Sequence, residues 1–418
     1  MEESLPMKKE EVFSRERQVD QILNRGVIVD VLPDKKSFRQ RLLANEPMKI
    51  YIGADPTSTS LHLSHAKNYM LLEEFRKLGH HVYVLFGDFT ARIGDPTGRA
   101  SARKQLTEKE VAQNVKSWIS QIKPLMDFDT KENPPQIVYN SEWLSKLTMK
   151  EVINLTSNVT VQQMLERDMF VKRIKKDQPI FLNEFLYPIM QGYDSVALGV
   201  DAELCGTDQI FNALVGRTLV KKFRQKEKFV VAVNLMENPV THDLMSKSRG
   251  TGVFLDSDPF NMYGSIMAQP DEMIKLFLIN NTRVPLTEVD SILHMKNMRD
   301  AKMRAALEVT KVFFGQEQAN KVQEKFVRLV QNKEFSEEIP QLLVNSESIE
   351  LFDLVKRCMP EMSGGEIRRL LNQNGVKINN SVFNDIKSSV FIPKEGLNIK
   401  IGKKKWFKIL LDNDSLHK

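Results

Sequence analysis

Residues 51–65 read YIGADPTSTSLHLSH, a stretch in which an apolar segment, a polar turn and the start of a helix follow directly on one another. The apolar residues up to Gly53 predict a buried strand. Residues 60–80, SLHLSHAKNYMLLEEFRKLGH, predict a helix with Ser60 as its N-cap and Gly79 at its end. The apolar segment 81–86 then follows without a hairpin turn. Strand, helix and strand in this order predict an α/β fold with a doubly wound, Rossmann-like parallel sheet.

The same pattern returns later in the chain. Residues 201–223, DAELCGTDQIFNALVGRTLVKKF, predict a strand, a turn and a helix, and KFVVAVNLM (228–236) predicts another buried strand. We therefore expect four parts, which are a helical N-terminal extension (1–40), a Rossmann-like domain (41–256) with a helical insertion (about 105–190), an α-helical domain (257–345) and a small α+β module (346–418).

The composition is that of an ordinary globular chain, with 41% hydrophobic and 27% charged residues among 418. The net charge of +6 falls entirely within residues 351–418, which hold 13 Lys and Arg against 7 Asp and Glu. A basic terminal module favours a nucleic-acid partner, although a solvated terminal domain would carry the same charge.

Two cysteines, Cys205 and Cys358, are too few for a disulfide framework or a four-thiolate zinc site. The charged N-terminus lacks the apolar core of a secretory signal, and no apolar run reaches the ~18 residues of a membrane span. We therefore expect a cytoplasmic protein without membrane contact.

Four polar clusters, at 54–65, 94–103, 206–209 and 242–252, fall where predicted strands end. Ligands of open α/β sheets bind beyond the carboxyl ends of the strands, so the four clusters together predict one ligand site.

The two histidines of the first cluster, His62 and His65, lie three positions apart near a helix start. A zincin helix spaces its histidines by four with an intervening Glu, so this pair does not predict a metal site. With Thr57 they can instead donate hydrogen bonds to an anion, aided by the helix dipole. Taken alone, the pair favours the simpler interpretation of two histidines on a helix surface.

The other clusters also have two interpretations. Lys247, between two serines in LMSKSRGTG (244–252), suits a loop that brings a cation to a phosphate, or a flexible surface loop. Asp208 suits a ribose or a helix cap. Arg99 and Arg103 suit a phosphate or solvent. No G-x-G-x-x-G, Walker loop or Cys/His constellation is present, which disfavours dinucleotide redox enzymes, P-loop NTPases and a protein-bound metal.

HLSH (62–65), followed about 180 residues later by LMSKS (244–248), resembles the HIGH and KMSKS signatures of class I aminoacyl-tRNA synthetases. Together with RIGDPTGR (92–99), YPIMQGYDS (187–195) and GTDQIFN (206–212), the opening stretch resembles bacterial tyrosyl-tRNA synthetases, and the likeness runs over nearly the whole chain. MSGGEIRRLLNQNGVKIN (362–379) resembles their S4-like RNA-binding module.

The resemblance implies a homodimeric ligase that joins L-tyrosine to ATP, used with Mg²⁺, and passes the tyrosyl group from the adenylate to tRNA(Tyr). The tyrosine carboxylate attacks the α-phosphate and is already ionised at pH 7, so that no general base is needed. Catalysis then consists of positioning two anions and stabilising charge on the departing pyrophosphate.

The resemblance also implies roles for individual residues. Those that would act on the phosphates are Thr57, His62, His65, Arg99, Arg103 and Lys247. Those that would bind the rest of ATP are Gly53, Asp55, Ser64, Gly206, Asp208, Met245, Ser246 and Ser248. Those that would bind tyrosine are Tyr51, Asp95, Tyr187, Gln191, Asp194 and Gln209, with Tyr51 and Asp194 on either side of the phenolic hydroxyl. Those that would contact RNA are Arg368, Arg369 and Lys377.

Two positions depart from the family pattern. Ser64 replaces the glycine that lets adenine approach the backbone, and Leu244 replaces the first lysine of KMSKS. They leave open a catalytically weakened paralogue that acts as an RNA-binding or regulatory protein. A third candidate, tryptophan activation, is disfavoured by Tyr51 with Asp194 and by the S4-like end.

Overall fold

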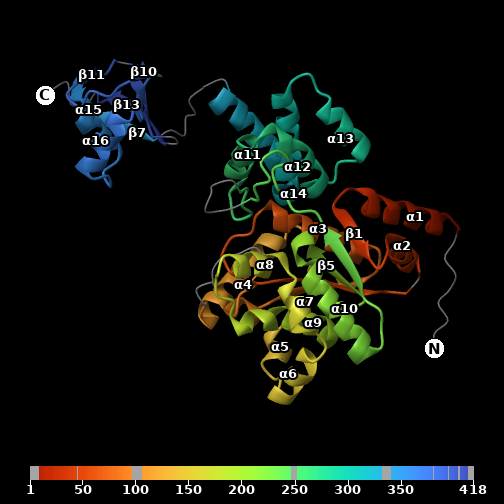
Figure 1. Cartoon of the computed structure of the whole chain (residues 1–418). Helices are drawn as coiled ribbons and strands as arrows, with labels where there is room; N and C mark the ends of the chain where they lie inside the picture. Colours follow the sequence, from red (N-terminus) through yellow and green to blue (C-terminus); the bar gives the residue numbers. More distant parts are fainter. Residues whose placement is uncertain are drawn as a thin grey trace. The chain divides into compact units, whose positions relative to one another are not determined.

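The computed structural model describes residues 9–44, 46–96, 106–245, 252–331, 340–379, 381–393, 395–402 and 405–412. The chain divides into two compact units, residues 1–324 and 325–418, coloured red to cyan and blue in Figure 1. Within the described ranges no helix is long and apolar enough to cross a membrane.

The first unit is built on a sheet with the strand order β1-β6-β5-β2-β3-β4. The strands are β1 (Ile28–Leu32), β2 (Lys49–Ala54), β3 (His81–Phe86), β4 (Gln136–Tyr139), β5 (Ala202–Gly206) and β6 (Phe229–Val233). Neighbouring strands are parallel except β1, which runs antiparallel to β6. The doubly wound sheet expected from the sequence is thus confirmed.

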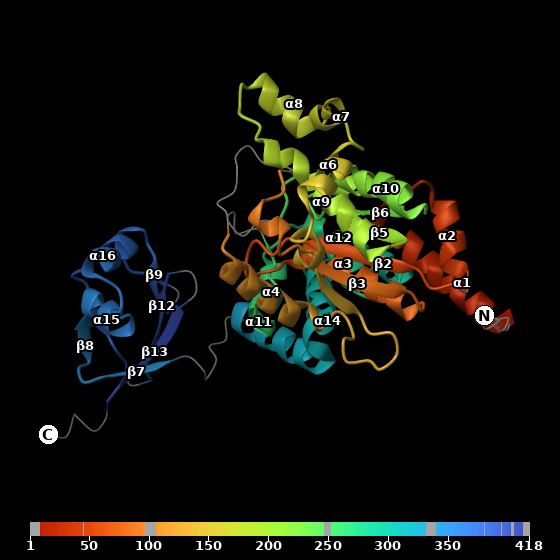
Figure 2. The ribbon, with the colours of Figure 1, turned by 90° about the horizontal axis from the view of Figure 1, so that it is seen from below.

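Two helices cover the centre of this sheet from opposite sides (Figure 2). Helix α3 (Leu63–Lys77) packs on β2 and β3, and α10 (Ile210–Arg224) packs on β5 and β6. Right-handed crossovers that leave β2 and β5 in opposite directions require this arrangement. The adjacent carboxyl ends of β2 and β5 are therefore the switch point at which such sheets bind ligands.

The start of α3 differs from the sequence prediction. The N-cap is His62, and Ser60 instead donates through Oγ to Asp256 Oδ2 at 2.5 Å. The backbone N–H of Leu61 donates to Gln121 Oε1 at 2.8 Å, which holds this segment extended against α4 (Glu108–Ile122). These tertiary contacts override the local preference of serine for the cap position.

Two predicted domain boundaries also need correction. The N-terminal extension holds helices α1 (Lys9–Asn24) and α2 (Lys35–Leu43), but β1 lies between them and belongs to the central sheet. Residues 105–190 are not purely a helical insertion, because β4 pairs with β3 and extends the same sheet. The remaining helices of that stretch are α5 (Ser141–Leu144), α6 (Met149–Thr156), α7 (Val161–Leu165), α8 (Asp168–Lys175) and α9 (Leu182–Leu198).

Helices follow the sheet, as expected for residues 257 onward. They are α11 (Pro259–Met267), α12 (Ile274–Asn281), α13 (Leu286–Leu293) and α14 (Met298–Phe326), with the short helical turns η3 (Asp271–Met273) and η4 (Val327–Gln331). Two further short turns lie within the sheet region, η1 (Thr90–Arg92) after β3 and η2 (Thr207–Gln209) after β5.

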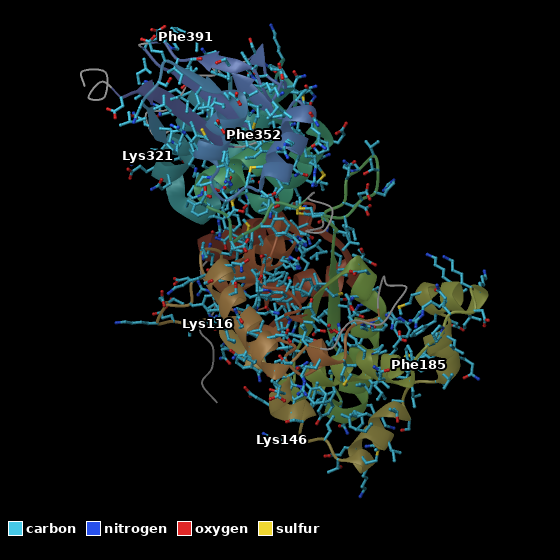
Figure 3. The ribbon with its side chains drawn as sticks, turned by 90° about the vertical axis from the view of Figure 1, so that its left-hand side faces the viewer. Lys116, Lys146, Phe185, Lys321, Phe352 and Phe391 are labelled. Carbon is cyan, nitrogen blue, oxygen red and sulfur yellow. The ribbon has the colours of Figure 1, made fainter. Side chains whose placement is uncertain are left out.

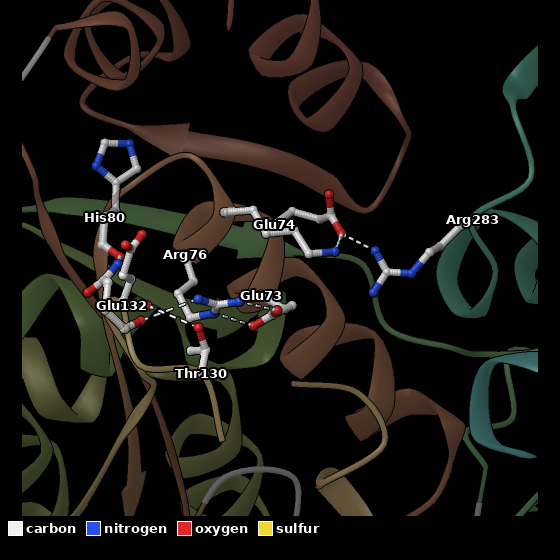
Figure 4. A network of polar contacts seen from close by, with 9 residues as sticks. Glu73, Glu74, Arg76, His80, Thr130, Glu132 and Arg283 are labelled. Atoms are coloured by element: carbon white, nitrogen blue, oxygen red, sulfur yellow. Dashed lines mark hydrogen bonds and ion pairs between the residues drawn. The ribbon is translucent and has the colours of Figure 1, made fainter. Parts of the chain in front are cut away.

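Charged contacts fix α3 from its C-terminal half (Figure 4). Arg76 pairs with Glu73 at 2.8 Å and donates through Nη1 to the carbonyl oxygen of Asn133 at 3.3 Å. Glu74 pairs with Arg283, which lies between α12 and α13. The helix that carries His62 at its N-cap is thereby anchored at its other end.

The second unit is a small α+β domain. Its sheet has the order β10-β9-β12-β13-β7, and β8 pairs separately with β11. The elements are β7 (Gln341–Val344), β8 (Ser348–Glu350), α15 (Leu351–Cys358), α16 (Gly364–Asn372), β9 (Val376–Ile378), β10 (Ser381–Val382), β11 (Ser389–Phe391), β12 (Leu397–Ile401) and β13 (Lys405–Leu411). Because β7 pairs with β13, the predicted boundary at 346 lies too late in the chain.

Candidate active site

A cleft of about 660 Å³ opens at the carboxyl ends of β2 and β5. Every described residue for which the resemblance implies a role with phosphate, ATP or tyrosine lines it, namely Tyr51, Gly53, Asp55, Thr57, His62, Ser64, His65, Asp95, Tyr187, Gln191, Asp194, Gly206, Asp208, Gln209 and Met245. The other five, Arg99, Arg103, Ser246, Lys247 and Ser248, lie outside the described residues.

The two histidines form a pair at the start of α3, with ring centroids 4.0 Å apart. The backbone N–H of His62 donates to His65 Nδ1 at 3.2 Å, so that the proton of the neutral His65 ring is on Nε2. Burial lowers the pKa of His62 to about 4 and holds the pKa of His65 well below its usual value. Both rings are thus neutral at pH 7. His62 Nδ1 is buried and has no hydrogen-bond partner among the described residues.

At one end of the cleft, Tyr51 and Asp194 are almost completely buried, with 1% and 3% exposed. They do not bond to each other. The Tyr51 hydroxyl lies 2.9 Å from Ser195 Oγ, and the Asp194 carboxylate accepts hydrogen bonds from Trp143 Nε1 at 2.7 Å and Asn140 Nδ2 at 3.3 Å. Burial, with the nearby charge of other carboxylates, raises the pKa of Asp194 well above its usual value.

A buried ion pair lies behind Tyr51. Lys228, the residue immediately before β6, pairs with Glu203 of β5. The two side chains are 0% and 2% exposed. Lys228 Nζ also donates to Ser195 Oγ at 2.8 Å, and its ammonium lies 5.9 Å from the Tyr51 ring centroid. The orientation of the Tyr51 hydroxyl therefore depends on this ion pair through Ser195.

Asp55 is held on both carboxylate oxygens. Thr90 Oγ1 donates to Oδ1 at 2.6 Å and the Tyr187 hydroxyl donates to Oδ2 at 2.9 Å. A Cβ at Gly87 would lie 2.1 Å from Asp55 Oδ1 and 2.3 Å from Thr90 Oγ1, so that only glycine fits there. These contacts place Asp55 beside Tyr187, for which the resemblance implies a role in binding the tyrosine substrate. For Asp55 itself, the resemblance implies a role in binding adenosine.

A chain of hydrogen-bonded amide groups joins two lining residues of the cleft, Gln191 and Gln209, through the buried Asn212. Asn212 Nδ2 donates to Gln191 Oε1 at 3.0 Å and to Gln209 Oε1 at 2.8 Å. Gln209 Nε2 in turn donates to Asp95 Oδ2 at 2.7 Å, and Gln191 Nε2 donates to Glu203 Oε1 at 3.0 Å. The donor and acceptor ends of both glutamines are thus fixed by the protein.

Gly206, the last residue of β5, and Asp208 of η2 also line the cleft. A Cβ on Gly206 would lie 2.4 Å from Asp208 Oδ1, so this close approach requires glycine. Burial, with the nearby charge of Asp95, raises the pKa of Asp208. Ser64 lines the cleft together with Lys67 and Asn68 of the next turn of α3.

Several side chains of the site were not found from the sequence, namely Lys67, Thr90, Asn140, Trp143, Ser195, Glu203, Asn212 and Lys228. A signal existed for the ion pair, because Glu203 and Lys228 are charges at the centre and the edge of apolar strands. Charges in such positions are buried only when they are paired.

Among the residues that the structure describes, no group of three or more His, Cys, Asp or Glu side chains is arranged to hold a metal ion.

In the second unit, the three implied RNA contacts are exposed. Arg368 and Arg369 lie on α16 and Lys377 lies on β9. The Arg368 guanidinium lies 5.6 Å from the ring centroid of Phe352, which is labelled in Figure 3.

Comparisons with known proteins give one consistent result. The family model "tRNA synthetases class I (W and Y)" matches residues 43–331. The chain is 38% identical to a tyrosine–tRNA ligase of Carboxydothermus hydrogenoformans, covering 95% of this chain and 98% of that protein. It is 39% identical to one of Thermotoga maritima, covering 94% and 97%. A C-terminally truncated mitochondrial tyrosyl-tRNA synthetase of Aspergillus nidulans shares the fold with a TM-score of 0.65, at 24% identity, over 77% of this chain and 99% of that one.

Proposed function

The chain belongs to the tRNA synthetases of class I (W and Y), and we propose that it activates L-tyrosine with ATP and transfers the tyrosyl group to the 3′ end of tRNA(Tyr). The observation that carries the choice of tyrosine is the buried pair of polar groups at one end of the cleft. The Tyr51 hydroxyl and the Asp194 carboxylate each keep hydrogen-bonding capacity toward the cleft that they line.

The phenolic hydroxyl of a tyrosine substrate satisfies both groups, because it donates to the Asp194 carboxylate and accepts from the Tyr51 hydroxyl. Phenylalanine would leave the hydrogen-bonding capacity of both groups toward the cleft unused, which disfavours phenylalanine relative to tyrosine by roughly 10⁴–10⁵-fold, a magnitude for which tyrosine-activating enzymes are themselves the standard example. Trp143 and Asn140 position Asp194, and Ser195 positions Tyr51.

The rest of the cleft suits two anionic reactants. Thr57, His62 and His65 supply neutral donors at the N-terminus of α3, where the helix dipole favours negative charge. The buried Nδ1 of His62 supports a ligand at this point. Donors held in place before the reaction stabilise charge on the phosphates without reorganising. Bound ATP would bring Mg²⁺, whose charge assists departure of pyrophosphate.

We assign the remaining residues by their place in the cleft. Gln191 and Gln209, fixed by Asn212, would contact the ammonium and carboxylate of tyrosine, with Asp95 and Tyr187 beside them. Gly53, Ser64, Gly206, Asp208 and Met245 would contact the adenosine part of ATP. Asp55 would act as a positioning residue for Tyr187. Arg99, Arg103, Ser246, Lys247 and Ser248 keep the phosphate and ATP roles that the resemblance implies.

The homodimer is part of the proposal. Large apolar side chains are exposed on the helices from α6 to α9, including Met149, Ile153, Val161 and Leu182 with 61–78% of their surface accessible. Apolar surface of this extent favours contact with a second copy. Sedimentation equilibrium at micromolar protein should give about twice the chain mass of 48.1 kDa, and a monomer at that concentration would contradict this part.

The terminal unit is proposed to bind tRNA through Arg368, Arg369 and Lys377. Phosphate contacts give an affinity that falls steeply with salt. Removing residues 332–418 should therefore lower the rate of tRNA aminoacylation and make that rate less dependent on salt. The rate of adenylate formation should stay the same. Equal loss of both reactions would mean that the unit only stabilises the fold.

The decisive experiment is ATP–pyrophosphate exchange on the purified protein with tyrosine, phenylalanine and tryptophan in parallel. Exchange with tyrosine alone supports the proposal and shows that Ser64 and Leu244 are tolerated. Exchange with tryptophan would reassign the substrate. A folded protein without exchange would favour the weakened paralogue, for which tRNA affinity is the next measurement.

A further inference from the structure

The cleft has an unusual balance of charge. Five carboxyl groups line it, those of Asp55, Asp95, Asp194, Glu203 and Asp208. Among its described lining residues, Lys67 alone is a lysine or arginine. A site for a polyanionic nucleotide requires cations, so the position of this one ammonium is informative.

Lys67 lies in the second turn of α3 and only 2% of it is exposed. Its Nζ donates to Asn68 Oδ1 at 2.9 Å, which uses one of its three N–H groups. Ser64, Lys67 and Asn68 share one face of the helix by their spacing, and all three line the cleft. A buried ammonium with donors to spare thus lies on the helix face at the adenosine end.

Several titratable side chains surround Lys67. His62, the N-cap of α3, and His65, two residues before Lys67, precede it, and Asp208 of η2 interacts with it electrostatically. On its other side Lys67 also lines a groove with Arg25 and Glu74. Burial lowers the pKa of Lys67 to about 7, and the Asp208 carboxylate opposes that shift. The charge of this amine is therefore sensitive to its surroundings near neutral pH.

We propose that Lys67 is a nucleotide-binding residue of this site, whose ammonium donates to the ribose–phosphate part of bound ATP from the face of α3 opposite Asp208. The inference deepens the proposed function and rests on it. An anionic ligand favours the ammonium form, because opposite charges attract strongly in a poorly solvated cleft. Binding of ATP is therefore coupled to uptake of a proton.

The first test uses three variants in tyrosine-dependent ATP–pyrophosphate exchange. Lys67→Met should raise the KM for ATP about tenfold to a hundredfold, the usual effect of losing a charged hydrogen bond, and leave the KM for tyrosine unchanged. Lys67→Arg keeps the charge and should recover part of the loss. Lys77→Met, three turns along the same helix and outside the cleft lining, is the matched control and should match wild type.

The second test separates a ligand contact from a structural role. The folded pKa of about 7 lies below the unfolded value of about 10.5, so the unfolded chain holds the proton between these values and wild-type stability rises with pH across that window. Lys67→Met should abolish that rise and melt at a higher temperature than wild type at pH 7 without ligand. A structural lysine would instead give a variant that melts at a lower temperature.

The third test measures the proton uptake directly. Calorimetric titration of the wild-type protein with Mg·ATP in two buffers of different ionisation enthalpy should report net proton uptake at pH 7.5, and none for Lys67→Met. Absence of uptake in the wild type, or an unchanged KM for ATP in an active Lys67→Met, would overturn the role of Lys67 and leave tyrosine activation standing. Failure of the wild type to exchange with tyrosine would instead overturn the proposed function.

Discussion

Replacing Lys228 by methionine removes one partner of the buried pair with Glu203 and keeps most of the apolar stem. The two side chains are 0% and 2% exposed, so the remaining Glu203 carboxylate would lie in the interior without its counter-ion. Gln191 would still donate to it, but an amide does not replace an ammonium.

The structure sets the size of the effect. Removing one partner of a fully buried ion pair costs about 3–5 kcal/mol, because an uncompensated charge stays buried. For a chain of this size each kcal/mol lowers the melting temperature by roughly 2 °C, so we expect a fall of about 6–10 °C in the first unit. Ser195 also loses its donor, so the KM for tyrosine should rise as the Tyr51 hydroxyl is released.

Differential scanning calorimetry measures the first effect, and two further variants control it. Lys226→Met breaks the Lys226–Asp201 pair, whose side chains are 35% and 15% exposed, and should cost no more than about 1 kcal/mol. The double variant Glu203→Gln with Lys228→Met removes both charges and should recover most of the loss. If Lys228→Met melted within 2 °C of wild type, or the double variant melted lower than the single one, the buried charge would not be the reason.

Three other outcomes follow from the structure, two from the cleft and one from the buried His80. His62→Ala should lower the rate of tyrosine-dependent exchange by about 10²–10³, as the loss of one preorganised donor does, and a change under fivefold would exclude that role. Asp194→Asn should raise the KM for tyrosine and narrow the preference over phenylalanine in a competition assay, where unchanged selectivity would remove Asp194 from phenol recognition. The pKa of His80 is lowered by burial to about 4, below the ~6.5 of an unfolded chain, so the unfolded state binds the proton first and stability should fall as pH drops from 6.5 to 4. His80→Gln should flatten this dependence in melting curves, and an equally steep fall in the variant would contradict it.

The sequence predicts the central architecture well because its signals there are local. The apolar strands and the helix after residue 60 each have a clear period, and the carboxyl ends of parallel strands necessarily meet at one edge. Polar clusters as distant as Asp55 and Asp208 could therefore be assigned to one site, and both line the same cleft.

What the sequence could not predict depends on tertiary neighbours. Ser195 as the hydrogen-bond partner of Tyr51 could not be predicted, because sequence spacing does not show which side chain of α9 reaches the Tyr51 hydroxyl. The pairing of Glu203 with Lys228 depends on β5 and β6 being adjacent in the sheet. Likewise β1 was missed, because Asp30 interrupts its apolar pattern and its partner strand is far away in the chain.

The position of β1 at the sheet edge also has a consequence for synthesis on the ribosome. Its partner β6 is some 200 residues later, so at about 5–20 residues per second β1 waits roughly 10–40 s for the strand with which it pairs. A free apolar strand is prone to pair with another chain during such a delay. Asp30, exposed at the middle of β1, places a charge where a foreign strand would have to accommodate it. Asp30, which interrupts the apolar pattern of β1 in the sequence, thus also disfavours pairing of β1 with another chain until β6 has been synthesised.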